Sequence, residues 1–256
     1  MKRTFILALL TIAFGIMPLT AQNAAPIQLV FIGNSITQGA RLANPIVEGP
    51  ATQTALLLNG AGRSVEVLNR GLSGTTTFDW LPNDTTRCFP PLITTTDAFF
   101  RPGATHIFSV MLGTNDSAET RCNGAPVNPE RYGENLSAII DSLLTRYPDA
   151  KVILNYPIWY SPTTYNGARY LQGGLDRLQT YHPVIDRIVA SRPGQVFAGR
   201  REAYDAFAGK PQLFDEEDGR VGKFYLHPNA EGARLLATFW AAAVLDVAGS
   251  VSAAQH

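Results

Sequence analysis

The residue types that acyl transfer requires stand in separate short blocks of the sequence. Ser35 follows closely on a glycine at the end of an apolar run, and His227 precedes a proline near the C-terminus. A serine hydroxyl becomes an effective nucleophile when a neighbouring base takes its proton, and imidazole is the usual base. These two residues therefore predict a serine nucleophile, Ser35, activated by His227.

The tetrahedral oxyanion of acyl transfer also needs hydrogen-bond donors that are in place before the charge develops. Ser35 offers its own N–H, Gly74 allows a close approach of the backbone and offers a second N–H, and the Asn115 side chain offers an amide. Taken singly, a glycine or asparagine after a strand is commonly a turn residue. Their recurrence after three successive apolar runs favours an oxyanion site formed by Ser35, Gly74 and Asn115.

The positions of the other three histidines can be explained without a catalytic role. His106 opens an apolar run, His182 stands before a proline in a predicted helix, and His256 is the last residue. His227 alone lies in a predicted loop directly before a helix start, where Asn229 is a suitable N-cap. This favours His227 as the base over a solvent-exposed histidine without a role.

An alternation of strands and helices must position these residues. Short apolar runs predict buried strands at 28–32, 65–68, 106–112, 151–154 and 195–198. Apolar residues at offsets of three and four predict helices at 51–58, 129–147, 175–190 and 230–247. This order implies an α/β fold with a parallel sheet covered on both faces, whose ligands bind at the carboxyl ends of the strands.

The N-terminus has the order of a secretory signal peptide. Lys2 and Arg3 precede an apolar stretch at 5–17, and small residues follow it. A membrane anchor is the alternative, but the stretch is shorter than the ~20 residues that span a bilayer. We expect a signal peptide at 1–21, a single domain at 22–256, and an exported protein, periplasmic or extracellular, without stable membrane insertion after the signal is removed.

The charge balance and the cysteine count of the sequence limit the kinds of partner and cofactor that the protein is expected to bind. Basic and acidic residues number 21 each, which gives no electrostatic argument for binding nucleic acid. Cys88 and Cys122 lack the spacing of metal ligands, and we expect neither a metal nor a cofactor. In an oxidising compartment this pair favours a structural disulfide over two separate buried thiols.

Together the blocks resemble those of the SGNH hydrolases, also called GDSL esterases and lipases. The resemblance covers most of the chain after the first 25 residues and assigns the nucleophile to Ser35, the oxyanion donors to Ser35, Gly74 and Asn115, and the base to His227. The family often has aspartate before the serine, where this chain has Asn34. The implied fold is a flavodoxin-like three-layer α/β/α sandwich with a central parallel sheet of about five strands.

One family feature is missing. An aspartate three residues before the histidine usually completes the triad, and this chain has Phe224 there. The acidic run 215–218 offers Asp218 and Asp215 as orienting acids, although such a run is commonly a solvated loop. The alternatives are a backbone carbonyl that orients His227, or a protein with little activity on esters.

The substrate prediction rests on aromatic residues and on the family. Trp159 and Tyr160 follow the fourth predicted strand and could form a platform for sugar rings, or they could pack as a lid. Exported members of the family often remove acetyl groups from carbohydrates. We therefore expect a carboxylic ester hydrolase acting on an acylated small molecule or polysaccharide, with a lipase or acyl-lipid hydrolase and a carbohydrate-binding pseudoenzyme as the alternatives.

Overall fold

The computed structural model describes residues 25–83 and 87–253. The signal peptide predicted at 1–21 lies outside the described residues, so export remains a prediction.

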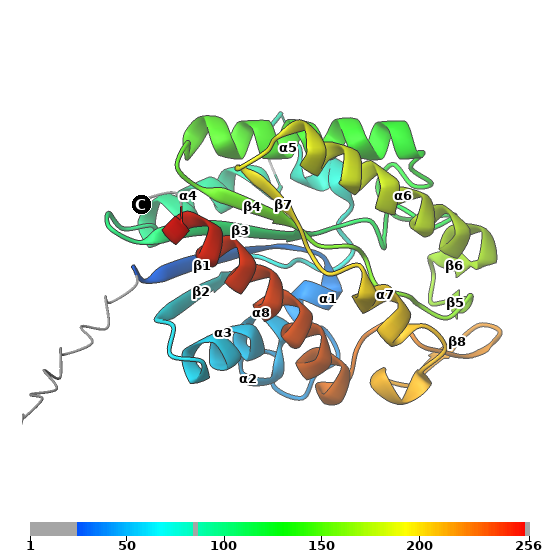
Figure 1. Cartoon of the computed structure of the whole chain (residues 1–256). Coiled ribbons are helices and arrows are strands. Elements are labelled where there is room, and N and C mark those ends of the chain that lie inside the picture. Colours follow the sequence, from blue (N-terminus) through cyan, green and yellow to red (C-terminus); the bar gives the residue numbers. More distant parts are fainter. Residues whose placement is uncertain (1–24, 84–86, 254–256) are drawn as a thin grey trace, which may run out of the picture.

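A five-stranded parallel sheet forms the centre of the molecule, in the order β2-β1-β3-β4-β7 (Figure 1). The strands are β1 (Ile27–Gly33), β2 (Val65–Asn69), β3 (Thr105–Met111), β4 (Lys151–Leu154) and β7 (Val196–Ala198). All neighbouring pairs are parallel, and β1 and β3 pair along their whole lengths. All five predicted strands are present within one residue of their predicted bounds.

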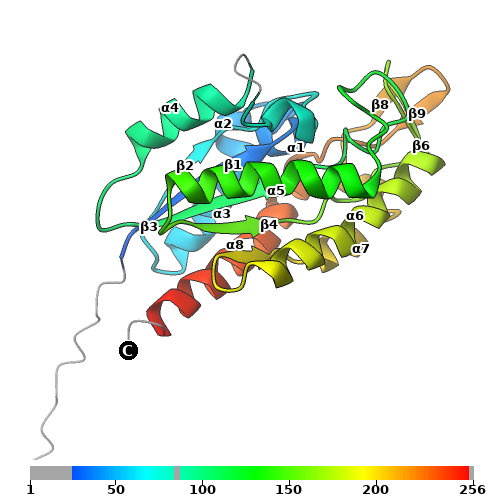
Figure 2. The same cartoon turned by 90° about the horizontal axis from the view of Figure 1, so that it is seen from above.

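Helices cover both faces of this sheet. Figure 1 shows α5 (Pro129–Arg146) and α6 (Gln172–Ser191) above it and α3 (Pro50–Gly60) and α8 (Ala230–Ala253) below it. The helix α4 (Phe89–Phe99), which the sequence analysis did not predict, lies beside α5 on the upper face (Figure 2). The predicted α/β/α sandwich is confirmed.

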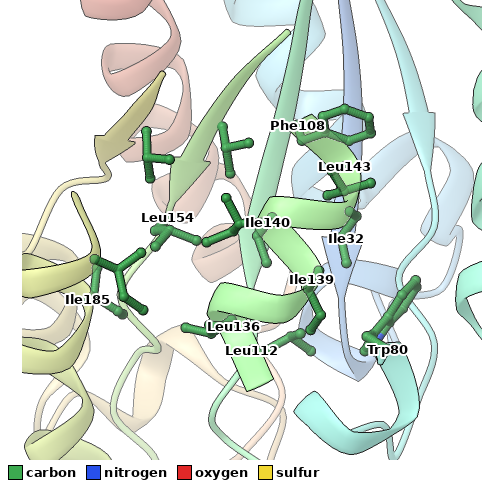
Figure 3. Close-up of a cluster of buried hydrophobic side chains, with 14 of the residues drawn as sticks. Ile32, Trp80, Phe108, Leu112, Leu136, Ile139, Ile140, Leu143, Leu154 and Ile185 are labelled. Atoms are coloured by element: carbon green, nitrogen blue, oxygen red, sulfur yellow. The ribbon is translucent and has the colours of Figure 1, made fainter. Parts of the chain in front are cut away.

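The central strands β1, β3 and β4 are largely apolar because side chains on both of their faces are buried, whereas the edge strand β2 is partly exposed. Along β1, Val30 and Ile32 join the core beneath α4, α5 and α6, whereas Leu29 and Phe31 join the core against α3 and α8. Figure 3 shows the first core, in which strand residues such as Phe108 and Leu154 meet a row of α5 side chains.

The sequence of α5 shows why that helix forms and which face it buries. Asn128 caps its start, accepting a hydrogen bond from the N–H of Arg131 at 2.8 Å, and a proline occupies the first helical position. Its buried face carries Leu136, Ile139, Ile140 and Leu143 (Figure 3), each of which stabilises the fold by about 1.5–3 kcal/mol through removal from water.

The C-terminal helix α8 begins as predicted, because the Asn229 side chain accepts hydrogen bonds from the N–H groups of Glu231 and Gly232, both at 3.0 Å. The segment Ala230–Gly249 is long and apolar enough to cross a membrane. More than half of it is buried within the protein, where α8 packs against α3, as a core helix does.

Short elements gather at the carboxyl-end edge of the sheet. Two antiparallel hairpins, β5 (Thr163–Tyr165) with β6 (Arg169–Leu171) and β8 (Glu217–Gly219) with β9 (Gly222–Phe224), pack against each other through β5 and β9. Figure 1 shows both hairpins beyond the ends of the parallel strands. The remaining elements are α1 (Ser35–Gln38), α2 (Pro45–Glu48), η1 (Thr77–Trp80), α7 (Glu202–Phe207) and η2 (Pro211–Leu213).

The predicted Cys88–Cys122 disulfide is wrong. Cys88 is buried in the core beneath α4, whereas Cys122 packs in a separate apolar cluster with the hairpin residue Tyr170. Cys122 is a free thiol whose Sγ lies 3.2 Å from the Tyr170 hydroxyl oxygen.

Candidate active site

Four residues predicted from separate sequence blocks line one cleft. The cleft has a volume of about 430 Å³, and Ser35, Gly74, Asn115 and His227 are among the residues that line it. Ser35 follows β1, Gly74 follows β2 and Asn115 follows β3, so the cleft lies where parallel sheets usually bind ligands.

A chain of hydrogen bonds joins a serine, a histidine and a carboxylate at this cleft. The Ser35 Oγ lies 3.0 Å from His227 Nε2, and His227 Nδ1 lies 2.7 Å from Glu217 Oε1. Ser35 and His227 are each only 8% exposed. The arrangement can take a proton from the Ser35 hydroxyl while the carboxylate faces the opposite side of the imidazole ring.

A tight strand-to-helix turn presents Ser35. A side chain at Gly33 would meet the Met111 carbonyl oxygen at 2.8 Å and the Thr37 hydroxyl at 2.0 Å, so only glycine fits there. Asn34 then caps α1 by accepting a hydrogen bond from the N–H of Ile36 at 3.0 Å. Ser35 is the first helical residue, and the first N–H groups of a helix have no acceptor within it, which leaves the Ser35 N–H for a ligand.

The backbone at Gly74 is open to the cleft. Gly74 has φ +78°, in the left-handed region that favours glycine, and a Cβ built there would meet no atom within 4 Å. The loop before it is anchored to α1, because Ser73 donates from its N–H and its hydroxyl to the Gln38 side-chain oxygen at 2.9 and 2.5 Å.

Two hydrogen bonds fix the Asn115 amide. Its Nδ2 donates to the Thr75 carbonyl oxygen at 2.8 Å, and its Oδ1 accepts from the Tyr170 hydroxyl at 2.7 Å. An amide nitrogen carries two hydrogens, so the second remains available for a ligand in the cleft. The structure therefore brings Ser35, Gly74 and Asn115, the three residues predicted to donate to an oxyanion, to the same cleft.

Asp116, the next residue, links this loop to η1. Its Oδ1 accepts from the N–H and the hydroxyl of Thr77 at 2.9 and 2.5 Å. Complete burial raises the pKa of Asp116 to about 6, and the hydrogen bonds from Thr77 only partly oppose this rise. The loops that carry Gly74 and Asn115 are thus joined by a buried carboxyl group.

The acid that contacts the imidazole differs from the two predicted. Asp218 is 87% exposed at its side chain and pairs with Lys223 Nζ at 2.7 Å, and the nearest basic group to Asp215 is Arg41 Nε at 3.6 Å. Neither is bonded to the His227 ring, so both predictions are corrected in favour of Glu217.

Strand pairing explains the correction. Glu217 lies directly opposite Phe224 in the β8–β9 hairpin. Opposed residues of an antiparallel pair project from the same face about 5 Å apart. In the family pattern, an aspartate at position 224 would contact this side of the imidazole. Here Glu217, on the neighbouring strand, contacts it instead. The acidic run was a visible signal, but it did not show which of its four members faces the histidine.

The predicted aromatic platform is wrong. Tyr160 is fully buried, and its hydroxyl lies 3.0 Å from the Ser117 hydroxyl. Trp159 packs edge-on against Phe214, with ring centroids 5.7 Å apart. Both side chains support loops instead of lining the cleft, whose lining includes a different aromatic residue, Tyr170.

Within residues 25–83 and 87–253, no group of three or more histidine, cysteine, aspartate or glutamate side chains could hold a metal ion.

A sequence model of the GDSL-like lipase/acylhydrolase family matches residues 31–235. The chain belongs to this family. The resemblance read from its motifs is thereby confirmed, and this GDSL-like acylhydrolase is an ester-hydrolysing enzyme. No curated protein matches its sequence.

Solved structures share the fold of this acylhydrolase at low identity. A carbohydrate acetylesterase from Sinorhizobium meliloti is 21% identical, with a TM-score of 0.56 over 86% of this chain and 99% of that one. An aryl esterase from M. smegmatis is 20% identical, with a TM-score of 0.56 over 86% and 99%. A lipase/acylhydrolase from Enterococcus faecalis is 18% identical, with a TM-score of 0.56 over 88% and 96%.

Proposed function

We propose that this enzyme hydrolyses carboxylic esters with Ser35 as nucleophile, His227 as general base and Glu217 as the acid that orients the histidine. The observation that carries the proposal is the continuous contact from the Ser35 Oγ to His227 Nε2 at 3.0 Å and from His227 Nδ1 to Glu217 at 2.7 Å.

The first half of the reaction forms an acyl-enzyme. The Ser35 Oγ attacks the ester carbonyl carbon while His227 Nε2 takes the hydroxyl proton. The resulting oxyanion accepts hydrogen bonds from the N–H groups of Ser35 and Gly74 and from the Asn115 amide. His227 then gives its proton to the alcohol oxygen, the ester C–O bond breaks, and the alcohol leaves.

The second half regenerates the enzyme. A water molecule attacks the acyl carbon as His227 Nε2 takes one of its protons. The tetrahedral intermediate collapses, the bond to the Ser35 oxygen breaks, and His227 returns the proton to that oxygen as the carboxylic acid leaves. Glu217 holds the Nδ1–H tautomer that leaves Nε2 free to accept, and its charge stabilises the imidazolium formed in both halves.

The cleft favours a short acyl group on a hydroxyl-rich alcohol. Its lining includes only three aliphatic side chains among the described residues, those of Ala40, Ala168 and Leu226. Ser73 and Asn166 supply polar groups at the same cleft. We infer that the enzyme removes O-acetyl or similar groups from carbohydrates, in line with its likeness in fold to a carbohydrate acetylesterase. A lipase needs a longer apolar groove for its acyl chain.

The proposed site of action is outside the cytoplasm. The charged, apolar and then small residues of the first 21 positions support export to the periplasm or the medium, where acylated polysaccharides are met.

Ester hydrolysis by wild type, Ser35→Ala and His227→Ala tests the proposal. We expect wild type to turn over p-nitrophenyl acetate and to release acetate from acetylated xylan, with p-nitrophenyl palmitate a poor substrate and both variants at least a thousandfold slower. Equal, slow rates for wild type and Ser35→Ala would instead favour a carbohydrate-binding pseudoenzyme, and a preference for the palmitate would favour a lipase.

A further inference from the structure

Two arginines with unusual backbone geometry line the cleft that contains Ser35 and His227. Arg41 has φ +74° and Arg121 has φ +69°, and they are the only non-glycine residues with positive φ among residues 25–83 and 87–253. The left-handed region is unfavourable for a residue with a Cβ, and such outliers gather at functional sites. Both of them line this one cleft.

The charge of these arginines is not balanced within the cleft. No aspartate or glutamate is among its described lining residues. Arg41 Nε lies 3.6 Å from Asp215 and 3.8 Å from Glu217, so acids beside the cleft partly offset its charge. Arg121 is exposed, and no carboxylate of the described residues lies within 4 Å of its guanidinium. It is therefore a free cation at the cleft.

A second hollow adjoins the cleft at Arg121. It has a volume of about 430 Å³ and shares Arg121, Asn166 and Gly167 with the cleft. It adds Arg220 and one acid, Asp218, which pairs with Lys223. A molecule that places its ester at Ser35 can therefore continue past Arg121 into a second polar space. This continuation suits the alcohol part of an ester of a sugar chain.

We propose that the enzyme acts on acyl esters of glycans that carry carboxylate groups, that is, uronate-containing polysaccharides, and that Arg121 binds a uronate carboxylate beside the scissile ester. A guanidinium presents two parallel N–H donors that match a carboxylate, and the pairing is strongest when no protein acid competes for it. This inference rests on the proposed function, because it assumes that the ester is cleaved at Ser35.

Arg121→Asn is the most informative variant. Asparagine tolerates the left-handed backbone better than most residues, so the variant removes the cation without adding strain. Arg121→Lys keeps the positive charge but loses the fork of donors. Arg187, exposed on α6 beside a separate groove, gives the matched control Arg187→Gln.

The substrates are polygalacturonate and its carboxyl-reduced, neutral counterpart, acetylated to the same degree, with p-nitrophenyl acetate as a small neutral ester. We expect wild-type kcat/KM for acetate release to be about tenfold higher on the anionic polymer, a preference that shrinks between low and high salt because exposed charges are screened. Arg121→Asn abolishes that preference, Arg121→Lys keeps part of it, and Arg187→Gln keeps all of it. Arg187→Gln leaves hydrolysis of p-nitrophenyl acetate within about twofold of wild type, and in the two Arg121 variants this hydrolysis falls less than acetate release from the anionic polymer does.

Equal wild-type rates on the two polymers overturn the inference, as does activity on p-nitrophenyl acetate with none on either polymer. A loss in Arg121→Asn that is the same for all three substrates also overturns it, since a structural role alone would produce that pattern. If the proposed ester hydrolysis at Ser35 is itself wrong, the result is different, because wild type would then hydrolyse no ester faster than Ser35→Ala.

Discussion

Replacing Glu217 with glutamine removes the charge on the imidazole while keeping the side chain's shape. Glu217 Oε1 lies 2.7 Å from His227 Nδ1, and both side chains are only 11% exposed. Glutamine can still accept a hydrogen bond from Nδ1–H, so the variant isolates the electrostatic part of the contact. We expect kcat to fall, because the imidazolium that forms in the transition state loses its counter-charge.

The geometry sets the size of this fall. Two unit charges about 4 Å apart attract by about 4 kcal/mol at the effective dielectric constant of about 20 that suits such partly buried pairs. Arg41, whose Nε lies 3.8 Å from the other Glu217 oxygen, weakens the attraction, although its side chain is 55% exposed and therefore screened. Since each 1.36 kcal/mol is a factor of ten in rate, we expect kcat to fall between about a hundredfold and about a thousandfold.

Initial rates on p-nitrophenyl acetate at saturating substrate measure this change. Glu216→Gln is the matched control: its carboxylate lies one residue away, contacts Lys223 and Tyr225, and does not touch the His227 ring. Glu217→Ala leaves a space beside the ring, where added formate should restore part of the rate. A loss of less than about threefold in both Glu217 variants would refute the role assigned to this carboxylate.

Further predictions concern the support of the site and the core. Tyr170→Phe removes the hydroxyl that donates a hydrogen bond to the Asn115 side chain. We expect kcat on p-nitrophenyl acetate to fall about tenfold with KM nearly unchanged. A purely structural role for the hydroxyl would lower only the melting temperature. The pKa of Asp116 is raised from 3.8 to about 6, so between these pH values the folded state binds more protons than the unfolded chain. The contribution of Asp116 to stability therefore falls as pH rises from about 4 to about 6. Asp116→Asn removes that fall, so urea unfolding should show its stability rising by about 2 kcal/mol relative to wild type over this range, and parallel curves for the two proteins would contradict the assignment. Ile139→Ala in the buried face of α5 should lower the free energy of unfolding by about 3 kcal/mol and leave the kcat of the folded enzyme unchanged, and a loss below 1 kcal/mol would show that this core can collapse around the cavity.

The parallel sheet could be predicted because its signal is local. Each strand is a short apolar run, and the order of runs and amphipathic segments dictates a parallel sheet with crossovers. The helix α4 was missed because Pro90, Pro91 and three consecutive threonines are weak helix formers, and packing over the sheet overrides that preference. The β5–β6 and β8–β9 hairpins, of three residues per strand, carry too little alternation to be recognised.

The placement of Ser35, Gly74 and Asn115 followed from the rule that carboxyl ends of parallel strands share one edge. Glu217 could not be chosen among its acidic neighbours, because the choice depends on the register of a hairpin that was not predicted. Trp159 and Tyr160 were misassigned for a related reason. Aromatic side chains in a loop can face solvent or the core, and only the packing of the adjacent hairpins shows that Tyr160 is buried.

The most direct test of the central claim is the site at which a phosphonate that mimics the tetrahedral intermediate becomes covalently attached. Peptide mapping by mass spectrometry should find a single adduct, on the Ser35 oxygen, and His227→Ala should slow its formation by at least about a hundredfold because the hydroxyl then lacks its base. An adduct on another residue, or labelling of Ser35 at an unchanged rate without His227, would contradict the mechanism.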